Sequence, residues 1–187
     1  VCIGSNINNN RTWRNTITTL FQGTLASPST SVEVDGTSQI AFPFSQTLNK
    51  SSAHRLLDAY KTGYYIMPGS TIQVEKKNQV SKDQSGSGAT SNADYANAYI
   101  DHGAAPVDGK YAYVVLPNTT PTALSDFATA MASPSTRVFD ILQQDEHAHI
   151  VRENASGVTG YSLFTSNTNL TSNDVVKGND VPCVAML

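Results

Sequence analysis

The seven residues from Lys110 to Leu116 constrain the fold of this chain more than any other stretch. In an extended strand, successive side chains point to opposite faces. Here both faces would be apolar or aromatic, with Tyr111, Tyr113 and Val115 on one side and Ala112, Val114 and Leu116 on the other. A strand covered on both faces lies in the middle of a sheet. We therefore expect this strand to be central, following an earlier strand that ends at Tyr99 and Ile100.

Turn residues divide the rest of the chain into short segments. Alternating or β-branched runs predict strands at 1–7, 16–22, 31–34, 39–42, 63–67, 71–80, 137–143, 147–153, 157–165 and 181–187. Asp35-Gly36 is a strong hairpin signal. We expect 43–50 to be irregular, and 81–92 and 166–180 to be loops, the first of them mobile. Residues 53–58 could form one short turn, but we expect them to cover a sheet edge.

One helix is expected near residues 121–132. Pro121 suits its first turn, and Thr119 or Thr120 suits the N-cap. About ten short strands with regularly spaced turns and one helix indicate a mainly antiparallel β-sandwich. The length of 187 residues fits one domain over 1–187.

Composition excludes several classes of function. Charged residues are 14% of the chain and the formal net charge is -3, which argues against a nucleic-acid partner. No apolar run reaches membrane-spanning length, and no signal peptide is visible. The opening Val1–Gly4 and the end Pro182–Leu187 look like interrupted strands, so we expect a fragment of a larger multidomain chain, or a processed chain.

The two cysteines and five sequons are candidates for a disulfide bond and for N-glycosylation. Cys2 and Cys183 lie in the two terminal strands and are either buried thiols or a disulfide that closes nearly the whole chain. Five Asn-x-Ser/Thr sequons permit glycosylation in a eukaryotic host and, with the Ser/Thr/Asn-rich composition, favour a secreted protein: Asn10, Asn49, Asn118, Asn154 and Asn169.

No catalytic motif stands out in the sequence. A metal site at His147 and His149 would require a third ligand, and none is evident, so two polar residues on an exposed strand face are the simpler interpretation. We expect neither metal nor cofactor. Asp101 beside His102 would suit a general base, but such pairs are more often structural.

The polar loop from Asn8 to Asn15 offers the best binding site. Trp13 lies between Arg11 and Arg14. Aromatic faces stack on sugar rings, and guanidinium groups bind carboxylate or sulfate. Together with Asn8, these residues are candidates for contact with an acidic sugar. The alternative is a Trp that covers a sheet edge between two solvated Arg side chains.

Several short motifs, in this order, resemble the central β-sandwich of family 8 polysaccharide lyases, and most closely the chondroitin ABC lyases. The resemblance spans almost the whole chain. It rests on Ile3–Ile7, Thr18–Gln22, Gly63–Ile66, Ile72–Ser81, Ile100–Gly103 with Pro106, Tyr111–Tyr113, His147–Ile150 and Val158–Tyr161.

The resemblance implies a super-sandwich of the galactose mutarotase-like type from a secreted or periplasmic enzyme that cleaves glycosaminoglycans, chondroitin or hyaluronan, by β-elimination. It places His, Tyr and Arg on an upstream helical toroid and a Glu just before the position of Val1. His102 and Tyr111 align with sandwich residues and do not replace them. This chain alone would then be inactive and would support the substrate cleft.

Two alternatives remain at this stage. A free-standing carbohydrate-binding module would keep the sandwich and the Trp13 loop without a catalytic partner. A secreted structural protein would keep the fold without glycan recognition, which the acidic balance allows. Saturable binding to chondroitin sulfate or hyaluronan separates them.

Overall fold

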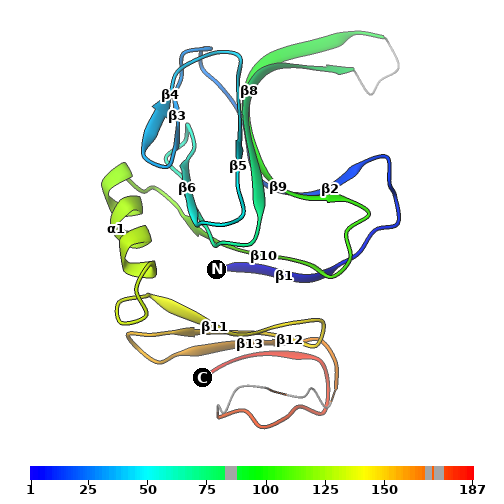
Figure 1. Ribbon diagram of the computed structural model, residues 1–187, viewed down its shortest axis with the longest axis vertical. Helices are drawn as coiled ribbons and strands as arrows, with labels where there is room; N and C mark the ends of the chain where they lie inside the picture. Colours follow the sequence, from blue (N-terminus) through cyan, green and yellow to red (C-terminus); the bar gives the residue numbers. More distant parts are fainter. Residues whose placement is uncertain (83–87, 167–169, 171–174) are drawn as a thin grey trace.

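The computed structural model describes residues 1–82, 88–166, 170 and 175–187. These residues form three antiparallel sheets and one helix (Figure 1). The mainly antiparallel β fold with a single short helix is therefore confirmed. Fourteen strands are present among the described residues, where about ten were expected, and they make three layers instead of two.

The first two sheets face each other as a sandwich. The six-stranded sheet runs in the order β1 (Cys2–Ile7), β10 (Gly109–Leu116), β7 (Gly63–Ile66), β6 (His54–Leu57), β3 (Val32–Val34) and β4 (Thr37–Gln39). The second sheet runs β2 (Asn15–Thr24), β9 (Thr90–Ala104), β8 (Thr71–Lys82) and β5 (Phe44–Leu48). Their facing side chains form the main core, which includes Ile66, Ile72, Val74 and Ile100.

Strand β10 has the central position that its sequence predicts. It pairs with β1 on one side and with β7 on the other. Tyr111, Tyr113 and Val115 pack on the main core, whereas Val114 and Leu116 belong to a second cluster on the opposite face of the sheet.

The helix α1 (Pro121–Met131) covers part of that opposite face. Thr120 is its N-cap, and the Thr120 hydroxyl accepts a hydrogen bond from the Ala123 amide at 3.2 Å. The ring of Phe127 on the helix packs edge-on against Tyr65 of β7, with ring centroids 5.6 Å apart. The predicted helix and its cap are confirmed.

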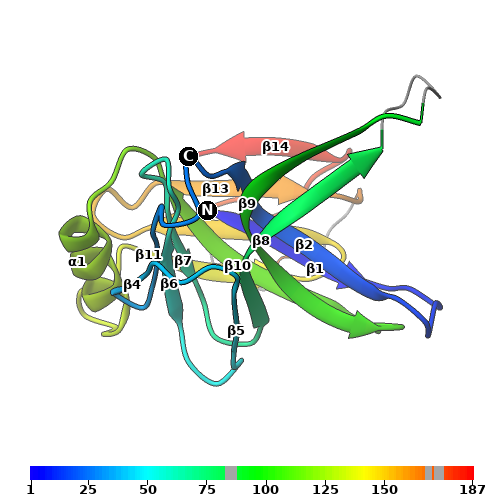
Figure 2. The same cartoon turned by 90° about the horizontal axis from the view of Figure 1, so that it is seen from above.

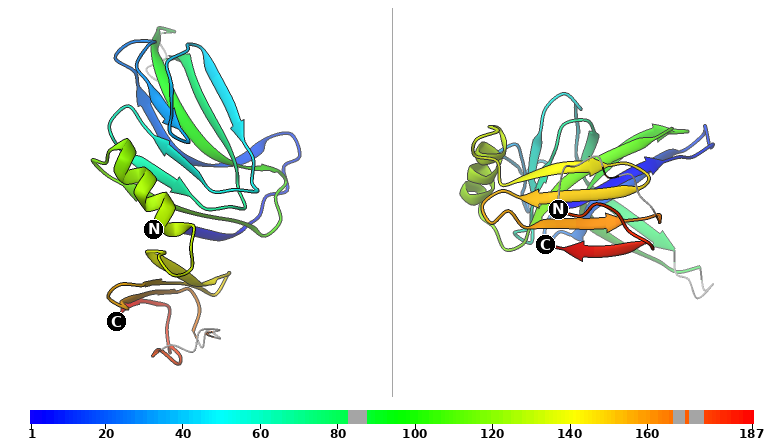
Figure 3. Two further views of the ribbon diagram at one scale, coloured as in Figure 1. Left: turned by 60° about the vertical axis from the view of Figure 1, so that its left-hand side comes forward. Right: turned by 90° about the horizontal axis from the view of Figure 1, so that it is seen from below.

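The third sheet lies on the same side of the six-stranded sheet as α1. Its order is β11 (Phe139–Gln144), β12 (Ala148–Glu153), β13 (Thr159–Leu163) and β14 (Cys183–Met186), and it lies across the six-stranded sheet (Figure 3). Gln144 Nε2 donates to the carbonyl oxygens of Gly4 and Tyr111, each at 2.8 Å. The Ser5 hydroxyl donates to the Asp145 carbonyl at 2.7 Å. These bonds join the third sheet to β1 and β10.

Three expectations about the middle of the chain are wrong. The strand expected at 39–42 is instead β4 at Thr37–Gln39, and 40–42 are not strand. Residues 43–50 are not irregular, because they contain β5, which pairs with β8. Residues 53–58 neither cover a sheet edge nor form one short turn, because they contain β6, which lies inside the sheet between β7 and β3. Its buried His54 is accommodated by Asp35 Oδ2 and the Asn49 carbonyl, each 2.8 Å from a ring nitrogen. Both partners come from other segments, so the local pattern did not indicate a strand.

The hairpin of β8 and β9 is longer than expected. The two strands have 12 and 15 residues and project beyond the rest of the sandwich (Figure 2). The loop predicted over 81–92 is therefore partly strand, because 81–82 and 90–92 belong to β8 and β9. Residues 83–87 lie outside the described residues, as do 167–169 and 171–174 of the predicted 166–180 loop.

Both cysteines are free thiols in this structure. Cys183 packs in the interior of the third sheet, beside residues such as Ile150 and Tyr161. Cys2 lies against Tyr113, whose pKa is raised to about 12 by burial and by the hydrogen bond with Cys2. The structure therefore has Cys2 beside Tyr113 and Cys183 against the cluster of the third sheet, with both thiols unpaired. In the described part of the chain, no helix has the length and apolarity to cross a membrane.

Candidate functional site

Two connections meet at one end of the sandwich, to the right in Figure 1. The first is the β1–β2 loop, and the second is the β9–β10 connection at 105–108. The Ala105 amide donates to the Arg11 carbonyl at 3.0 Å, and the Asn9 amide donates to the Pro106 carbonyl at 3.1 Å. The Asp108 amide donates to Asn8 Oδ1 at 3.0 Å. Asn8 therefore has a positioning role here, holding one loop to the other.

The tip of the β1–β2 loop presents an aromatic ring between two cations. The Trp13 side chain is 66% exposed. The guanidinium carbons of Arg11 and Arg14 lie over its ring, 5.6 and 5.0 Å from the ring centroid. Cation–π attraction fixes the two charges beside the ring. A ring this exposed is accessible to a ligand.

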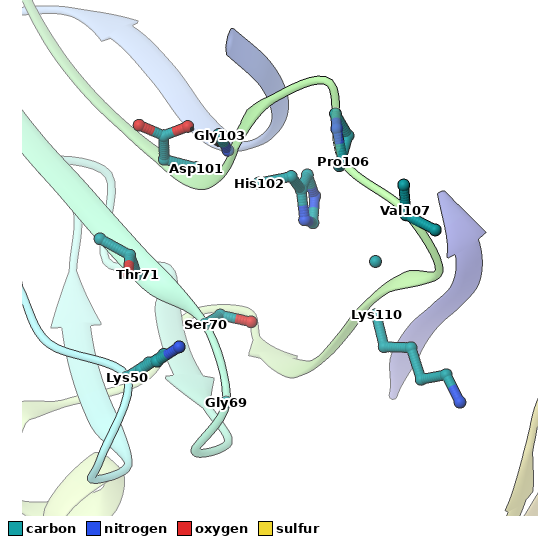
Figure 4. A pocket seen from close by; sticks show the side chains of 11 residues that line it. Lys50, Gly69, Ser70, Thr71, Asp101, His102, Gly103, Pro106, Val107 and Lys110 are labelled. Atoms are coloured by element: carbon teal, nitrogen blue, oxygen red, sulfur yellow. Dashed lines mark hydrogen bonds between the residues drawn. The ribbon is translucent and has the colours of Figure 1, made fainter. Parts of the chain in front are cut away.

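A pocket of about 410 Å³ lies beside these loops (Figure 4). The turn between β7 and β8, the end of β9 and the start of β10 contribute to its walls. Its lining comprises Lys50, Gly69, Ser70, Thr71, Asp101, His102, Gly103, Pro106, Val107, Gly109 and Lys110. Pro106 and Val107 also line a more open hollow of about 440 Å³ with Asn8, Asn9 and Asn10. The pocket and the Asn-rich loop are therefore parts of one continuous surface.

The Asp101–His102 pair in this pocket has the contacts of a structural pair. Asp101 accepts from Asn15 Nδ2 and from the Gly103 amide, both at 2.8 Å. Gly103, near the end of β9, has a φ of +78°, which a glycine adopts without strain. His102 Nε2 is 2.9 Å from the Thr18 hydroxyl. Burial lowers the pKa of His102, against the opposing effect of Asp101, so the ring is neutral near pH 7.

His147 and His149, the two histidines considered as metal ligands, lie in different environments. His147 precedes β12 and is exposed, with Nε2 3.6 Å from a Glu146 carboxylate oxygen. His149 is half-buried, 2.9 Å from the Ser5 hydroxyl, and its ring packs edge-on against Phe164. The described residues contain no group of three or more His, Cys, Asp or Glu side chains that could hold a metal ion.

Four of the five sequons can be placed. Asn10, Asn49, Asn118 and Asn154 are all exposed. Asn154 Nδ2, the atom to which a glycan would be attached, donates to the Arg137 carbonyl at 2.9 Å. Asn169 lies outside the described residues.

Sequence reasoning did not find the pocket residues Lys50, Ser70 and Lys110. They come from three separate segments that only the sheet pairing brings together. A partial signal existed, because Pro68-Gly69 predicts a turn immediately before Ser70 and Lys110 begins the central strand. Neither signal indicates that the two positions share a pocket.

Comparison with known proteins gives a consistent result. Residues 1–128 match the family model "Polysaccharide lyase family 8, super-sandwich domain". The chain is 29% identical over 164 residues to chondroitin sulfate ABC endolyase of Proteus vulgaris, covering 88% of this chain and 16% of that protein. It is 29% identical over 187 residues to chondroitin sulfate ABC exolyase of Bacteroides thetaiotaomicron, covering 100% and 16%.

The solved structures agree on the fold. A chondroitinase AC lyase known from enzyme–oligosaccharide complexes matches with a TM-score of 0.79 and 22% identity, over 99% of this chain and 26% of that one. A Paenibacillus xanthan lyase matches with a TM-score of 0.74 and 22% identity, over 98% and 18%. The chain thus spans about one-sixth of the length of the two curated relatives described above, 16% in each case.

Proposed function

This chain belongs to polysaccharide lyase family 8, as a super-sandwich domain, and from this premise we propose that it is the β-sandwich part of a secreted lyase that cleaves a chondroitin-type glycosaminoglycan. Both curated relatives described above are chondroitin sulfate ABC lyases. The reaction proposed is β-elimination, in which a base removes the proton next to the uronate carboxyl and an acid protonates the leaving glycosidic oxygen.

The role proposed for this chain is to hold the polymer, while an upstream helical toroid supplies the acid and base. The observation that carries this role is the exposed Trp13 ring held between Arg11 and Arg14. Such a group suits one sugar ring and one acidic substituent. The net charge of -3 does not oppose it, because the positive charge is concentrated locally.

The first test is titration of the chain with chondroitin sulfate at low salt, followed by the fluorescence of its single tryptophan and by calorimetry. We expect saturable binding that weakens about tenfold in Trp13→Ala, by analogy with the stacking of nucleic-acid bases on aromatic side chains, which contributes about 1–3 kcal/mol per base. Arg11→Gln and Arg14→Gln should each weaken binding and reduce its salt dependence.

Arg137→Gln provides a matched control with the same change in charge. Arg137 pairs with Asp140 at 2.8 Å near the third sheet, away from the Trp13 loop, and this variant should bind like the wild type. Absence of saturable binding at low salt, or equal binding by Trp13→Ala, would contradict the proposed role. Formation of unsaturated uronate products by this chain alone would contradict the assignment of the acid and base to another domain.

A carbohydrate-binding module without a catalytic partner is the second candidate. It is favoured by the fact that the Trp13 loop, the hollow and the pocket are all built from this chain. Both candidates predict the same binding. They differ in the intact mass of the native polypeptide, which would be several times larger for a lyase.

A further inference from the structure

The pocket beside the Trp13 loop has polar groups for which the protein itself supplies no partner. Ser70 is only 6% exposed, and its hydroxyl points into the pocket (Figure 4). Among the described residues, neither this hydroxyl nor the Lys50 ammonium has a hydrogen-bond or ion-pair partner. The Ser70 hydroxyl is open to the pocket, so it can donate a hydrogen bond to a ligand there.

Positive charge is in excess around this pocket. Lys50 extends toward it from one side, whereas the Lys110 side chain starts at the opposite wall and points away from the pocket (Figure 4), with its Nζ 3.7 Å from an Asp108 carboxylate oxygen. The one carboxylate in the lining is Asp101, and its two oxygens already accept hydrogen bonds from Asn15 and Gly103. An anion that enters the pocket meets the Lys50 ammonium and the Ser70 hydroxyl, and the charge of Asp101 is partly offset by its two hydrogen bonds.

The shape of the pocket limits the class of anion. Lys50, Ser70 and the His102 ring approach from different walls (Figure 4), an arrangement that suits an anion with three terminal oxygens better than a planar carboxylate. A volume of about 410 Å³ also leaves space for a sugar ring. Pro106 and Val107 connect this pocket to the hollow under the Asn-rich loop, so a polymer on Trp13 can reach it.

We propose that this pocket binds the sulfate group of a sulfated sugar residue and so makes the polymer site selective for sulfated over non-sulfated glycosaminoglycan. The inference rests on the proposed function and adds a substrate preference to it. Carboxylates repeat along both the sulfated and the non-sulfated polymer, and we assign their binding to Arg11 and Arg14. Selectivity comes from the donors of the pocket.

Ser70→Ala is the most informative variant. Because the hydroxyl makes no bond to the described protein, its removal should leave the fold intact, so a change in binding reports on the ligand. Lys50→Gln removes the charge from an exposed side chain, and Lys61→Gln, in the exposed β6–β7 turn, is the control with the same change in charge.

The experiment titrates the chain with chondroitin sulfate and with the same polymer after chemical desulfation, at one low salt concentration. The wild type should bind the sulfated polymer about tenfold more tightly, as expected for one set of charge-assisted hydrogen bonds. Ser70→Ala and Lys50→Gln should lower this ratio severalfold while binding of the desulfated polymer stays unchanged. Lys61→Gln should keep the ratio, and Trp13→Ala should weaken binding of both polymers.

The outcomes separate this inference from the proposed function. Equal binding of the two polymers by the wild type, or an unchanged ratio in both pocket variants, overturns the sulfate subsite and leaves the glycan role of the Trp13 loop in place. Failure of the wild type to bind either polymer overturns both.

Discussion

The sandwich formed by β1 to β10 and the third sheet formed by β11 to β14 are stabilised in different ways. In the sandwich, two sheets bury a common core of fourteen residues, whereas the interior cluster of the third sheet has four buried residues. The outer edge of the third sheet is also apolar and exposed, with Val184 83% and Met186 75% accessible. The sandwich therefore has a core of its own, and the third sheet depends more on its attachment.

The family match covers one of these two regions. The family match ends at residue 128, inside α1, so it includes the whole sandwich and none of the third sheet. The candidate binding surface also lies entirely on the sandwich. We infer that a change in the third sheet can be separated from binding, while a change in the main core cannot.

The largest effect is expected from truncation of an isoleucine in each region. Ile100 and Ile150 are both 0% exposed. Ile100→Ala should lower the free energy of unfolding of the sandwich by about 2–5 kcal/mol and weaken chondroitin sulfate binding, because β9 leads directly to the pocket. Ile150→Ala should increase hydrogen exchange in β12 and β13 and leave binding intact. Loss of binding in Ile150→Ala would show that the two regions are not independent.

Removal of the bridging amide should have the next largest effect. Gln144→Ala deletes two hydrogen bonds to the carbonyl oxygens of Gly4 and Tyr111. At about 0.5–1.5 kcal/mol for each bond, the free energy of unfolding should fall by roughly 1–3 kcal/mol. Denaturant titration followed by circular dichroism measures this change.

Gln22→Ala is the control for that measurement. Gln22 is exposed and bonds only to the side chain of Gln79 on the neighbouring part of the sheet, at 2.8 Å. Its removal should change stability by less than about 0.5 kcal/mol. Equal effects of the two glutamine variants would mean that the amide of Gln144 does not hold the two regions together.

Sequence patterns predicted the elements whose signals are local. The two apolar faces of β10 and the Pro121 start of α1 are read from neighbouring residues, and both are confirmed. Strand β6 was missed because its buried His54 depends on Asp35 and Asn49. No local pattern shows that such partners exist. The third sheet was missed as a separate layer because strand order is decided by long-range pairing.

The same distinction between local and long-range signals applies to the candidate site. The group of Arg11, Trp13 and Arg14 is contiguous in sequence, so the aromatic and basic side chains could be recognised together. Lys50 and Ser70 reach the pocket only through the pairing of β5, β8 and β9. Chemistry within one loop was therefore predictable, and chemistry shared between loops was not.

Replacement of a buried lysine in the main sandwich should raise the free energy of unfolding, whereas the substitutions above lower it. The expected change is smaller than theirs. Lys76 is 0% exposed, and its Nζ donates to the Gln39 carbonyl at 3.0 Å. Burial lowers its pKa, which means that the charged form is less stable in the fold than in water. Lys76→Met should raise the free energy of unfolding by about 1 kcal/mol, whereas Lys77→Met on the exposed face of β8 should change it by less than about 0.5 kcal/mol.

The smallest expected effect is a dependence of stability on pH. One histidine in each region contributes to it. Burial lowers the pKa of His102 in the sandwich and of His149 at the third sheet, each from an ordinary value of 6.5. Asp101 and Asp145, respectively, oppose these shifts only in part. At a pH below the ordinary histidine pKa, these two side chains bind protons in the unfolded chain that they do not bind in the folded chain. Stability should therefore fall as the pH decreases from about 7 to about 5.

The regional origin of this fall can be measured with two substitutions. His102→Gln should flatten the pH dependence of unfolding followed by Trp13 fluorescence, since both residues belong to the sandwich. His149→Gln should flatten it when hydrogen exchange in β12 is followed, because His149 contacts Ser5 across the boundary between the regions. The exposed His147→Gln is the control. If either substitution flattened both signals equally, the sandwich and the third sheet would unfold as one cooperative unit, and the independence inferred from their different cores would be wrong.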